Sequence, residues 1–281
     1  MERKQTSMTS SIEMSKFWSV VLLSKRYRLL YCPIGKVANT SIRKWLMNLE
    51  GIKQGYDESK DNVYNSSLAL KLSLEKTYTL KVLADNYYSF AFVRNPFSRL
   101  VSSYLNKFID QKPIPLAAAE RMNKIVNSRK FNKSQMYIQK LFKGSKRLKE
   151  PITFREFVKY LSETNIDEMD NHWAPQYLFL QTWQFDFIGK FEKLEKDFDT
   201  LLLNLNQREG IEPIKDILEI SNKSDYKSST NECFADIPGE RIRAFNSYPS
   251  YRFFYDQEIE RIVANIYSED FKLFGYKSKI K

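Results

Sequence analysis

The chain has 281 residues, 42% of them hydrophobic and 15% aromatic, so it can bury a large core and is not disordered in bulk. Its formal net charge of +11 favours an anionic partner, whether a nucleotide, an acidic polymer, nucleic acid or a membrane face. Two cysteines, Cys32 and Cys233, are too few for a disulfide framework and favour a reduced compartment. The early apolar run Val20–Leu23 is too short for a membrane span and lacks the small-residue cleavage pattern of a signal peptide.

The chain begins with a polar segment, residues 1–14, which we expect to be flexible. Two strands, Phe17–Leu23 and Arg28–Cys32, are predicted to follow around a turn at Ser24–Arg26. After a short loop, apolar residues recur at helical spacing between Ile42 and Leu49. The local prediction is therefore strand, loop, helix.

The loop before this helix has the composition of an anion-binding site. It contains Gly35 and Lys36, and it runs through Val37 and Ala38 into three small polar residues, each able to cap the helix: Asn39, Thr40 and Ser41. Such a junction aims backbone N–H groups and the positive end of the helix dipole at one point, beside an ammonium group. Phosphate is the anion that such sites bind most often.

The loop does not match a Walker A sequence. Leu30 stands where that motif requires its first glycine, and Val37 follows the lysine where a hydroxyl residue is required. An ATPase interpretation is weakened accordingly.

A second strand and helix follow further along the chain. Phe90–Val93 has the composition of a buried strand, Asn95 is placed to cap the next helix, and Pro96 suits its first residue. Arg94 would then lie where the strand ends, and Ser102 would project from the second turn of the helix. One phosphate group would reach both side chains.

The middle of the chain is rich in Lys and Asn. Ser66–Leu83 is predicted to be helical or irregular, and Leu116–Lys149 helical after a break at Asp110–Pro115. The second of these helices ends in a basic cluster, which is a solvated surface, a docking rim for an anionic acceptor or a contact for nucleic acid. The basic cluster comprises Lys140, Lys143, Lys146, Arg147 and Lys149.

The last third of the chain is predicted to alternate helices and strands. The predicted elements are a helix at Thr153–Leu161, a strand at Phe185–Gly189, a helix at Glu192–Leu205, a polar loop at Ser221–Thr230 and a helix at Glu258–Tyr267. In the polar loop, Lys227 and Ser228 are placed to lean over a nucleotide. No repeat, low-complexity tract or interior linker is found, which favours one domain, 15–281.

Together these motifs resemble the sulfotransferases that use 3′-phosphoadenosine 5′-phosphosulfate (PAPS). The nearest likeness is to family 2, the carbohydrate sulfotransferases that include the chondroitin 4-O and HNK-1 enzymes. Their first motif is similar to Tyr31–Thr40, apart from Gly35 and Asn39, and their second is similar to Phe92–Tyr104. Two later pieces match in the same order: Asn171-His172-Trp173 leading to Ile188–Glu192, and the ending Asp270–Tyr276.

The resemblance implies an α/β fold, with a P-loop-like central parallel sheet flanked by helices. It implies sulfuryl transfer from PAPS to a hydroxyl by in-line displacement, leaving 3′-phosphoadenosine 5′-phosphate (PAP). Lys36 would neutralise the leaving 5′-phosphate, assisted by the backbone and hydroxyl groups of Val37–Ser41. Arg94 and Ser102 would hold the 3′-phosphate.

Attack by a hydroxyl requires a general base. His172 is the sole histidine and could serve as that base, as an acceptor contact or as a structural residue. Asp85 and Glu75, upstream of the second motif, are the reserve candidates. One histidine and two distant cysteines do not form a typical zinc set, and this chemistry does not require a metal.

Several alternatives stay open. The acceptor is predicted to be a carbohydrate, with a small natural product as the alternative, and neither its identity nor the oligomeric state follows from the sequence. A phosphate-binding kinase or nucleotide hydrolase would need magnesium and ATP. A nucleic-acid-binding module is supported by charge alone, so no nucleic-acid partner is predicted. Animal members of the family are membrane-anchored Golgi proteins, and since no anchor is seen here, we expect a cytoplasmic and bacterial enzyme.

Overall fold

The computed structural model describes residues 21–52, 85–110, 152–181, 183–215, 217–219, 226–228, 232–245 and 247–280, with the backbone alone at 226–228. These residues fall into two compact units, and each is described by itself. The first comes from Met1–Asn95 and Gln176–Lys223, and the second from Pro96–Pro175 and Ser224–Lys281. The boundaries of a single domain at 15–281, with a flexible segment at 1–14, stay predictions.

The first unit is built on a four-stranded sheet in the order β1-β2-β3-β4. Its strands are β1 (Leu22–Ser24), β2 (Leu29–Cys32), β3 (Tyr88–Val93) and β4 (Phe187–Lys190). β1 is antiparallel to β2, whereas β2, β3 and β4 are mutually parallel. The predicted strand before the Lys36 loop, the strand before Arg94 and the strand ending near Gly189 are confirmed. The strand predicted at Phe17–Leu23 is described only from residue 21, and there β1 covers Leu22–Ser24.

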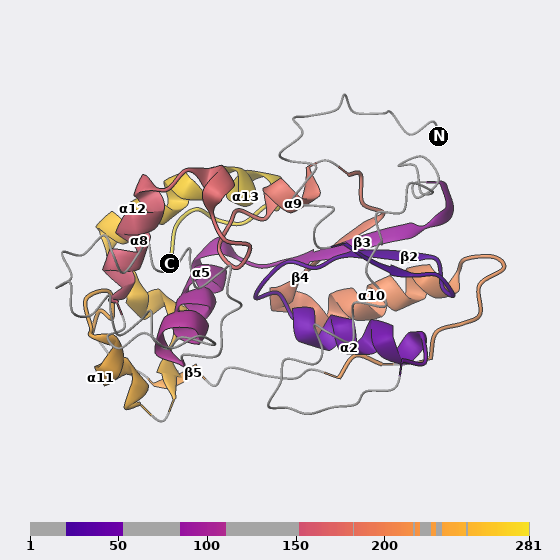
Figure 1. Cartoon of the computed structure of the whole chain (residues 1–281), viewed down its shortest axis with the longest axis horizontal. Coiled ribbons are helices and arrows are strands. Elements are labelled where there is room, and N and C mark those ends of the chain that lie inside the picture. Colours follow the sequence, from indigo (N-terminus) through magenta and orange to yellow (C-terminus); the bar gives the residue numbers. More distant parts are fainter. Residues whose placement is uncertain are drawn as a thin grey trace, which may run out of the picture. The chain divides into compact units, whose positions relative to one another are not determined.

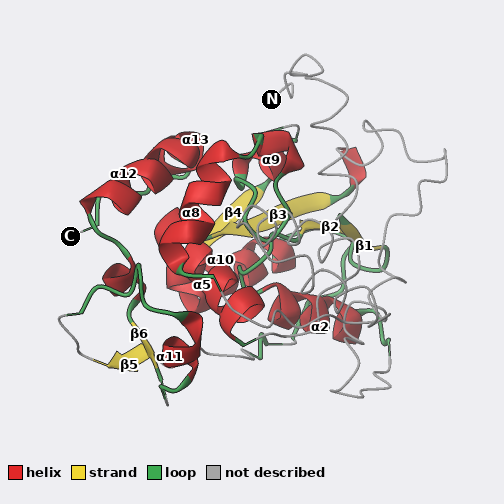
Figure 2. Ribbon diagram, turned by 60° about the vertical axis from the view of Figure 1, so that its left-hand side comes forward, coloured by secondary structure: helices red, strands yellow, loops and turns green. Residues whose placement is uncertain are grey.

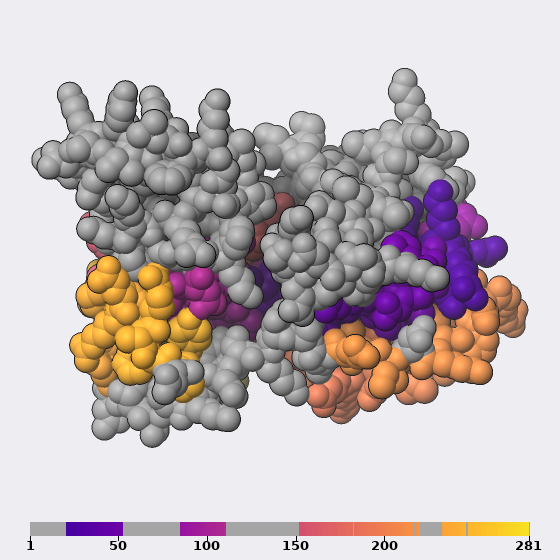
Figure 3. All heavy atoms as spheres, turned by 60° about the horizontal axis from the view of Figure 1, so that its bottom comes forward, coloured from indigo at the N-terminus to yellow at the C-terminus, as the bar shows by residue number. Residues whose placement is uncertain are grey.

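Helices flank this sheet. α2 (Asn39–Leu49) and α10 (Leu194–Asn206) lie together on one face, and the short α9 (Tyr177–Leu180) lies on the other (Figure 1). The ring of Trp45 meets the ring of Phe198 edge-on, with 5.0 Å between centroids, and Phe198 also stacks on Phe92 of β3. The two helices are also adjacent in the space-filling view, α2 in indigo to purple and α10 in orange (Figure 3). The prediction of a parallel sheet flanked by helices is thus confirmed in outline, with an antiparallel strand at one edge.

Gly189 is required where β4 meets β3. It is paired with Phe92, and a Cβ atom at position 189 would lie 2.3 Å from the Phe92 ring. A side chain there would push the ring out of the aromatic cluster beneath the sheet. The glycine therefore leaves the space that the Phe92 ring occupies.

The second unit is mainly helical (Figure 2). Its helices and strands are α5 (Pro96–Tyr104), α8 (Phe154–Glu163), β5 (Tyr226–Ser228), α11 (Gly239–Arg243), β6 (Tyr248–Pro249), α12 (Gln257–Ile266) and α13 (Ser268–Leu273). The buried ring of Tyr104 lies at its centre, in contact with the rings of Phe108, Phe154, Phe157 and Phe254.

The sequence located several of these elements correctly. Pro96 is the first residue of α5, and Thr153 begins α8 with a capping box to Glu156. The polar loop predicted at Ser221–Thr230 is wrong in part, because Tyr226–Ser228 forms β5 by pairing with β6. Three residues are too short for periodicity to reveal a strand.

Some predictions fall outside the described residues, namely Leu116–Lys149 with the basic cluster, and Ser66–Leu83. Within the described part of the chain, no helix is both long and apolar enough to cross a bilayer.

Candidate active site

The carboxyl ends of three parallel strands meet at one edge of the sheet in the first unit. β2 ends at Cys32, β3 at Val93 and β4 at Lys190. The segments that follow are the Lys36 loop, Arg94 and Phe191. In open α/β sheets ligands bind at this edge, so the topology gathers both predicted anion-binding motifs where a ligand would be expected.

The Lys36 loop enters α2 through an unusual backbone. Lys36 and Ala38 both have positive φ, 67° and 47°, a conformation that non-glycine residues adopt at a cost. Ala38 is the N-cap residue, and no side chain caps the helix. The prediction that Asn39, Thr40 or Ser41 caps it is therefore wrong.

Asn39 has a different role from the one predicted. It is the first helical residue, and its Oδ1 accepts a hydrogen bond of 2.8 Å from Arg43 Nε, one turn later. The Ile42 N–H donates to the Ala38 carbonyl at 3.1 Å, so helical bonding starts there and the N–H groups of Asn39, Thr40 and Ser41 lie ahead of it. This is the position at which helix N-termini bind anions.

Arg94 contacts the Lys36 loop directly. Its Nη1 donates to the Lys36 carbonyl oxygen at 3.1 Å, and its guanidinium lies over the Phe191 ring, 4.3 Å from the centroid. Only 7% of Arg94 is exposed. The two sequence motifs, 58 residues apart, therefore form one basic site at the carboxyl edge of the sheet.

Polar side chains hold the backbone around Arg94. The Arg94 N–H donates to Gln176 Oε1 at 2.9 Å, and Gln176 Nε2 donates to the Arg94 carbonyl at 2.8 Å. The next N–H, from Asn95, donates to Glu192 Oε1 at 2.7 Å. Sequence reasoning gave no role to Gln176 or Phe191, although Phe191 lies within the matched segment Ile188–Glu192 and Gln176 lies three residues after Trp173.

In the second unit, His172 is paired with a buried carboxylate. His172 Nδ1 lies 2.6 Å from Asp170 Oδ1, and the His172 backbone N–H donates to the same oxygen at 2.9 Å. The side chain of Asp170 is 10% exposed and that of His172 is 25% exposed. The ionised carboxylate accepts a hydrogen bond from Nδ1–H, so in a neutral imidazole the proton lies on Nδ1 and Nε2 is the proton acceptor.

The charge state of Asp170 supports this arrangement. Burial alone would raise the pKa of Asp170, but hydrogen bonds and charge from His172, together with the charge of Lys107, bring that pKa below its ordinary value. Asp170 is therefore ionised at neutral pH.

The turn that carries His172 is fixed through its carbonyl groups. Buried Arg99 donates to the carbonyls of Ala174 at 2.8 Å and Asn171 at 3.2 Å, and Ser103 Oγ donates to that of His172 at 2.7 Å. Arg99 thus has a structural role, because it holds the backbone of this turn. The imidazole is presented from a rigid turn.

The other predicted residues are distributed between the units. Ser102 is buried in α5 of the second unit, so its pairing with Arg94 stays a prediction. Lys227 and Ser228 belong to β5, and their roles also stay predictions. Asp85 is exposed and precedes β3, whereas Arg94 follows it, which disfavours Asp85 as the base. Glu75 lies outside the described residues.

Among the residues that the structure describes, no group of three or more His, Cys, Asp or Glu side chains is arranged to hold a metal ion.

The parallel sheet flanked by helices defines an α/β protein, and the uncapped N-terminus of α2, Lys36 and Arg94 lie together at the carboxyl edge of that sheet. Comparison with known proteins makes this specific. A family model described as "Sulfotransferase family" matches residues 20–277. The chain belongs to this family.

Curated relatives are similar at modest identity. Carbohydrate sulfotransferase 14 is 29% identical in Mus musculus over 184 residues, covering 65% of this chain and 45% of the relative. The Danio rerio protein of that name is 32% identical over 190 residues, with 65% and 47% covered. Carbohydrate sulfotransferase 10 of Xenopus laevis is 25% identical over 270 residues, with 92% and 67% covered.

This chain spans about half the length of the carbohydrate sulfotransferase 14 proteins that it matches. No solved structure gives a significant match.

Proposed function

We propose that this protein is an enzyme that transfers the sulfuryl group of PAPS to a hydroxyl of a carbohydrate acceptor. Membership of the sulfotransferase family and the names of the relatives support this reaction and acceptor class. The observation that carries the proposal is the hydrogen bond from Arg94 to the Lys36 carbonyl, because it joins the two predicted phosphate-binding motifs into one basic site.

The residues at this edge fit the donor nucleotide. PAPS carries a phosphate at each end of its ribose, and such anions are met by helix N-termini and by arginine, which binds phosphate oxygens in pairs. In the proposal Lys36 and the start of α2 receive the 5′-phosphate, and Arg94, together with Ser102, receives the 3′-phosphate. Lys227 and Ser228 are further proposed nucleotide contacts.

His172 is the proposed general base. Sulfuryl transfer requires in-line attack by the acceptor oxygen and removal of its proton, while negative charge grows on the leaving 5′-phosphate oxygen. The neutral imidazole takes the proton on Nε2, and Asp170 stabilises the imidazolium through Nδ1. Lys36 meets the charge on the leaving oxygen.

Calorimetry with PAP tests donor binding without knowledge of the acceptor. We expect wild-type protein to bind PAP at micromolar Kd with and without magnesium, and to bind adenosine 5′-phosphate (AMP) more weakly because it lacks the 3′-phosphate. Arg94→Ala should abolish this difference between the two nucleotides. Equal affinity for ATP, or a strict need for magnesium, would favour a kinase or nucleotide hydrolase instead.

The reaction itself is tested by incubation with PAPS labelled in its sulfate and a panel of unsulfated polysaccharides, with small phenols and alcohols as the alternative acceptors. Label in the polysaccharide fraction supports the carbohydrate class. Label in the small molecules alone would replace it with the natural-product alternative.

A further inference from the structure

Gln176 makes a two-sided contact with the backbone of a single residue. Its side-chain amide accepts from the Arg94 N–H and donates to the Arg94 carbonyl, at 2.9 and 2.8 Å, and Gln176 is fully buried. Both hydrogen bonds are lost if the side chain is replaced by an apolar one. A buried backbone N–H and carbonyl would then be left unsatisfied, which is costly.

The position of this contact matters because the pairing of β3 with its neighbouring strands ends just before it. β2 pairs with β3 as far as Ala91, and β4 pairs with it as far as Val93. Arg94 is the first residue beyond the last pair. The Gln176 amide therefore makes the two backbone hydrogen bonds to Arg94 that a neighbouring strand would otherwise make. It fixes the backbone for one residue beyond the paired part of β3.

The segment that carries Gln176 is itself attached to the sheet. Gln176 is the N-cap residue of α9, and the carbonyl of Phe179 in that helix accepts a hydrogen bond of 3.7 Å from the thiol of Cys32, the last residue of β2. The segment that carries Gln176 is thus anchored at the end of β2, while the Gln176 side chain binds the backbone just beyond the end of β3.

The side chain of Arg94 depends on this backbone position. Its guanidinium lies on the Phe191 ring and donates to the Lys36 carbonyl, where the backbone is left-handed. A rotation of the Arg94 backbone would carry the guanidinium away from both contacts. An arginine that binds phosphate in pairs is sensitive to such a rotation, because its donors form a rigid fork.

We propose that Gln176 is a positioning residue for the donor nucleotide, which acts by fixing the backbone of Arg94 so that its guanidinium faces the 3′-phosphate. This assignment rests on the proposed function, since it takes Arg94 to be the 3′-phosphate ligand. It goes beyond that function because it assigns an effect on donor affinity to an uncharged residue, which acts through the backbone of Arg94.

The test compares two nucleotides that differ by the 3′-phosphate. Gln176→Met keeps the approximate size of the side chain and removes both hydrogen bonds. Calorimetry should show PAP binding weakened about tenfold or more, with AMP binding changed by no more than about twofold. Gln176→Glu, which keeps the acceptor but not the donor, should fall between wild type and Gln176→Met, and it replaces that variant if Gln176→Met does not fold.

The chain provides a matched control at the end of α10. Asn206 holds the backbone of Ile214 in the same two-sided way, donating to its carbonyl at 3.1 Å and accepting from its N–H at 2.7 Å. Asn206→Leu should lower thermal stability without changing the ratio of the PAP and AMP affinities. This control separates loss of a two-sided amide contact in general from loss of the contact at Arg94.

A double-mutant cycle decides whether Gln176 acts through Arg94. In the Arg94→Ala background, Gln176→Met should cause no further loss of PAP affinity, because the side chain that it positions is gone. The positioning role would be overturned if Gln176→Met weakened PAP binding by the same factor in the Arg94→Ala background as in the wild type. It would also be overturned if Gln176→Met alone left PAP affinity unchanged. A wild-type protein that does not prefer PAP to AMP would instead overturn the proposed function, and this assignment with it.

Discussion

Lys36 and Arg94 are basic residues of one site, and the structure gives them different surroundings. Arg94 is buried, rests on an aromatic ring and is held through its backbone, as suits a ligand for a fixed phosphate. Lys36 is partly exposed and lies in a strained loop at the start of α2. Backbone strain of this kind is concentrated at functional sites.

The role proposed for Lys36 predicts a loss of turnover rather than of donor binding alone. Lys36→Met should lower kcat for labelled sulfate transfer about a hundredfold, because a preorganised donor to the leaving oxygen contributes about 3 kcal/mol in the transition state. The PAP Kd should rise by a smaller factor. If Lys36→Met instead lowered kcat/KM and PAP affinity by the same factor and left kcat unchanged, the lysine would bind the ground state and the transition state equally.

Asp170 and His172 predict a non-additive pair. Asp170→Asn should lower kcat about tenfold or more while PAP affinity is unchanged, because the imidazole loses the carboxylate that stabilises its charged form. In the His172→Ala background the same substitution should have little further effect on kcat.

The control for this pair is thermal unfolding, because Asp170 is also a buried residue. If Asp170→Asn lowers kcat equally with and without His172, the carboxylate supports the fold and not the base. Retained turnover in His172→Ala would remove the histidine from the base role altogether.

At the scale of elements, the sequence predicted those whose signals are local. The strand before Lys36, the strand before Arg94 and the helix that follows Thr153 all have short-range patterns. The wrong cap prediction and the missed residue Gln176 depended on a rare backbone conformation and on a contact between distant parts of the sequence. Ala38 starts α2 in a left-handed conformation, where three better caps follow it, and Gln176 meets Arg94 across 82 residues of sequence. Neither has a periodic signature.

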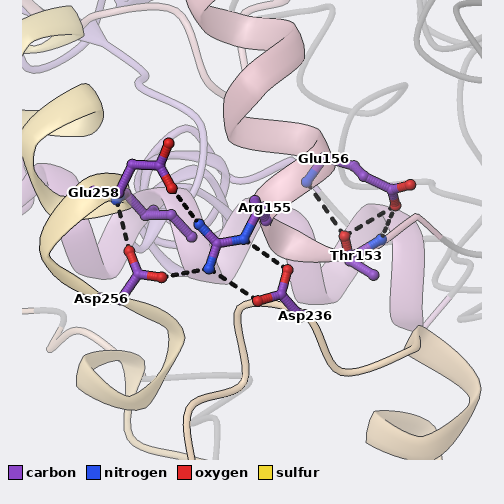
Figure 4. A network of polar contacts seen from close by, with 7 residues as sticks. Thr153, Arg155, Glu156, Asp236, Asp256 and Glu258 are labelled. Carbon is purple, nitrogen blue, oxygen red and sulfur yellow. Dashed lines mark hydrogen bonds and ion pairs between the residues drawn. The ribbon is translucent and has the colours of Figure 1, made fainter.

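A polar network ties three segments of the second unit together. Arg155, near the start of α8, binds three carboxylates, with Nε to Asp236 at 2.7 Å, Nη1 to Glu258 at 2.8 Å and Nη2 to Asp256 (Figure 4). Asp256 is also the N-cap residue of α12, since its Oδ1 accepts from the Ile259 N–H at 2.9 Å. The arginine therefore joins α8 to the start of α12.

The network predicts a stability loss that depends on pH. Burial opposes the shift, but the Ile259 N–H and Arg155 lower the pKa of Asp256 below its ordinary value of 3.8. A lowered pKa gives stability that is present above pH 3.8 and lost as the pH falls through the folded value. Arg155→Met should reduce the free energy of unfolding by about 1 kcal/mol at neutral pH, and by less in acid, as measured by urea unfolding.

Arg241→Met is the matched control, because Arg241 pairs with a single carboxylate, Glu232, at 3.2 Å and its side chain is 59% exposed. It should change the free energy of unfolding by less than about 0.5 kcal/mol. A loss for Arg155→Met that is the same at neutral and acid pH would mean that the side chain acts by packing and not by charge.

At the scale of the whole molecule, the net charge of +11 and the basic site should make different contributions to the proposed binding of an anionic nucleotide. The overall field acts at long range, raises the rate of association and is screened by salt. The contacts of Lys36 and Arg94 act at short range and govern dissociation. Salt and substitution should therefore change different rate constants.

Stopped-flow measurement of PAP binding tests this separation. Raising sodium chloride from about 0.05 to 0.5 M should lower the association rate constant severalfold in the wild type and in Arg94→Ala alike, because both keep nearly all of the net charge. Arg94→Ala should raise the dissociation rate constant at every salt concentration. An association rate that salt does not change would mean that the excess positive charge lies away from the nucleotide's path, and that the site binds its anion by local contacts alone.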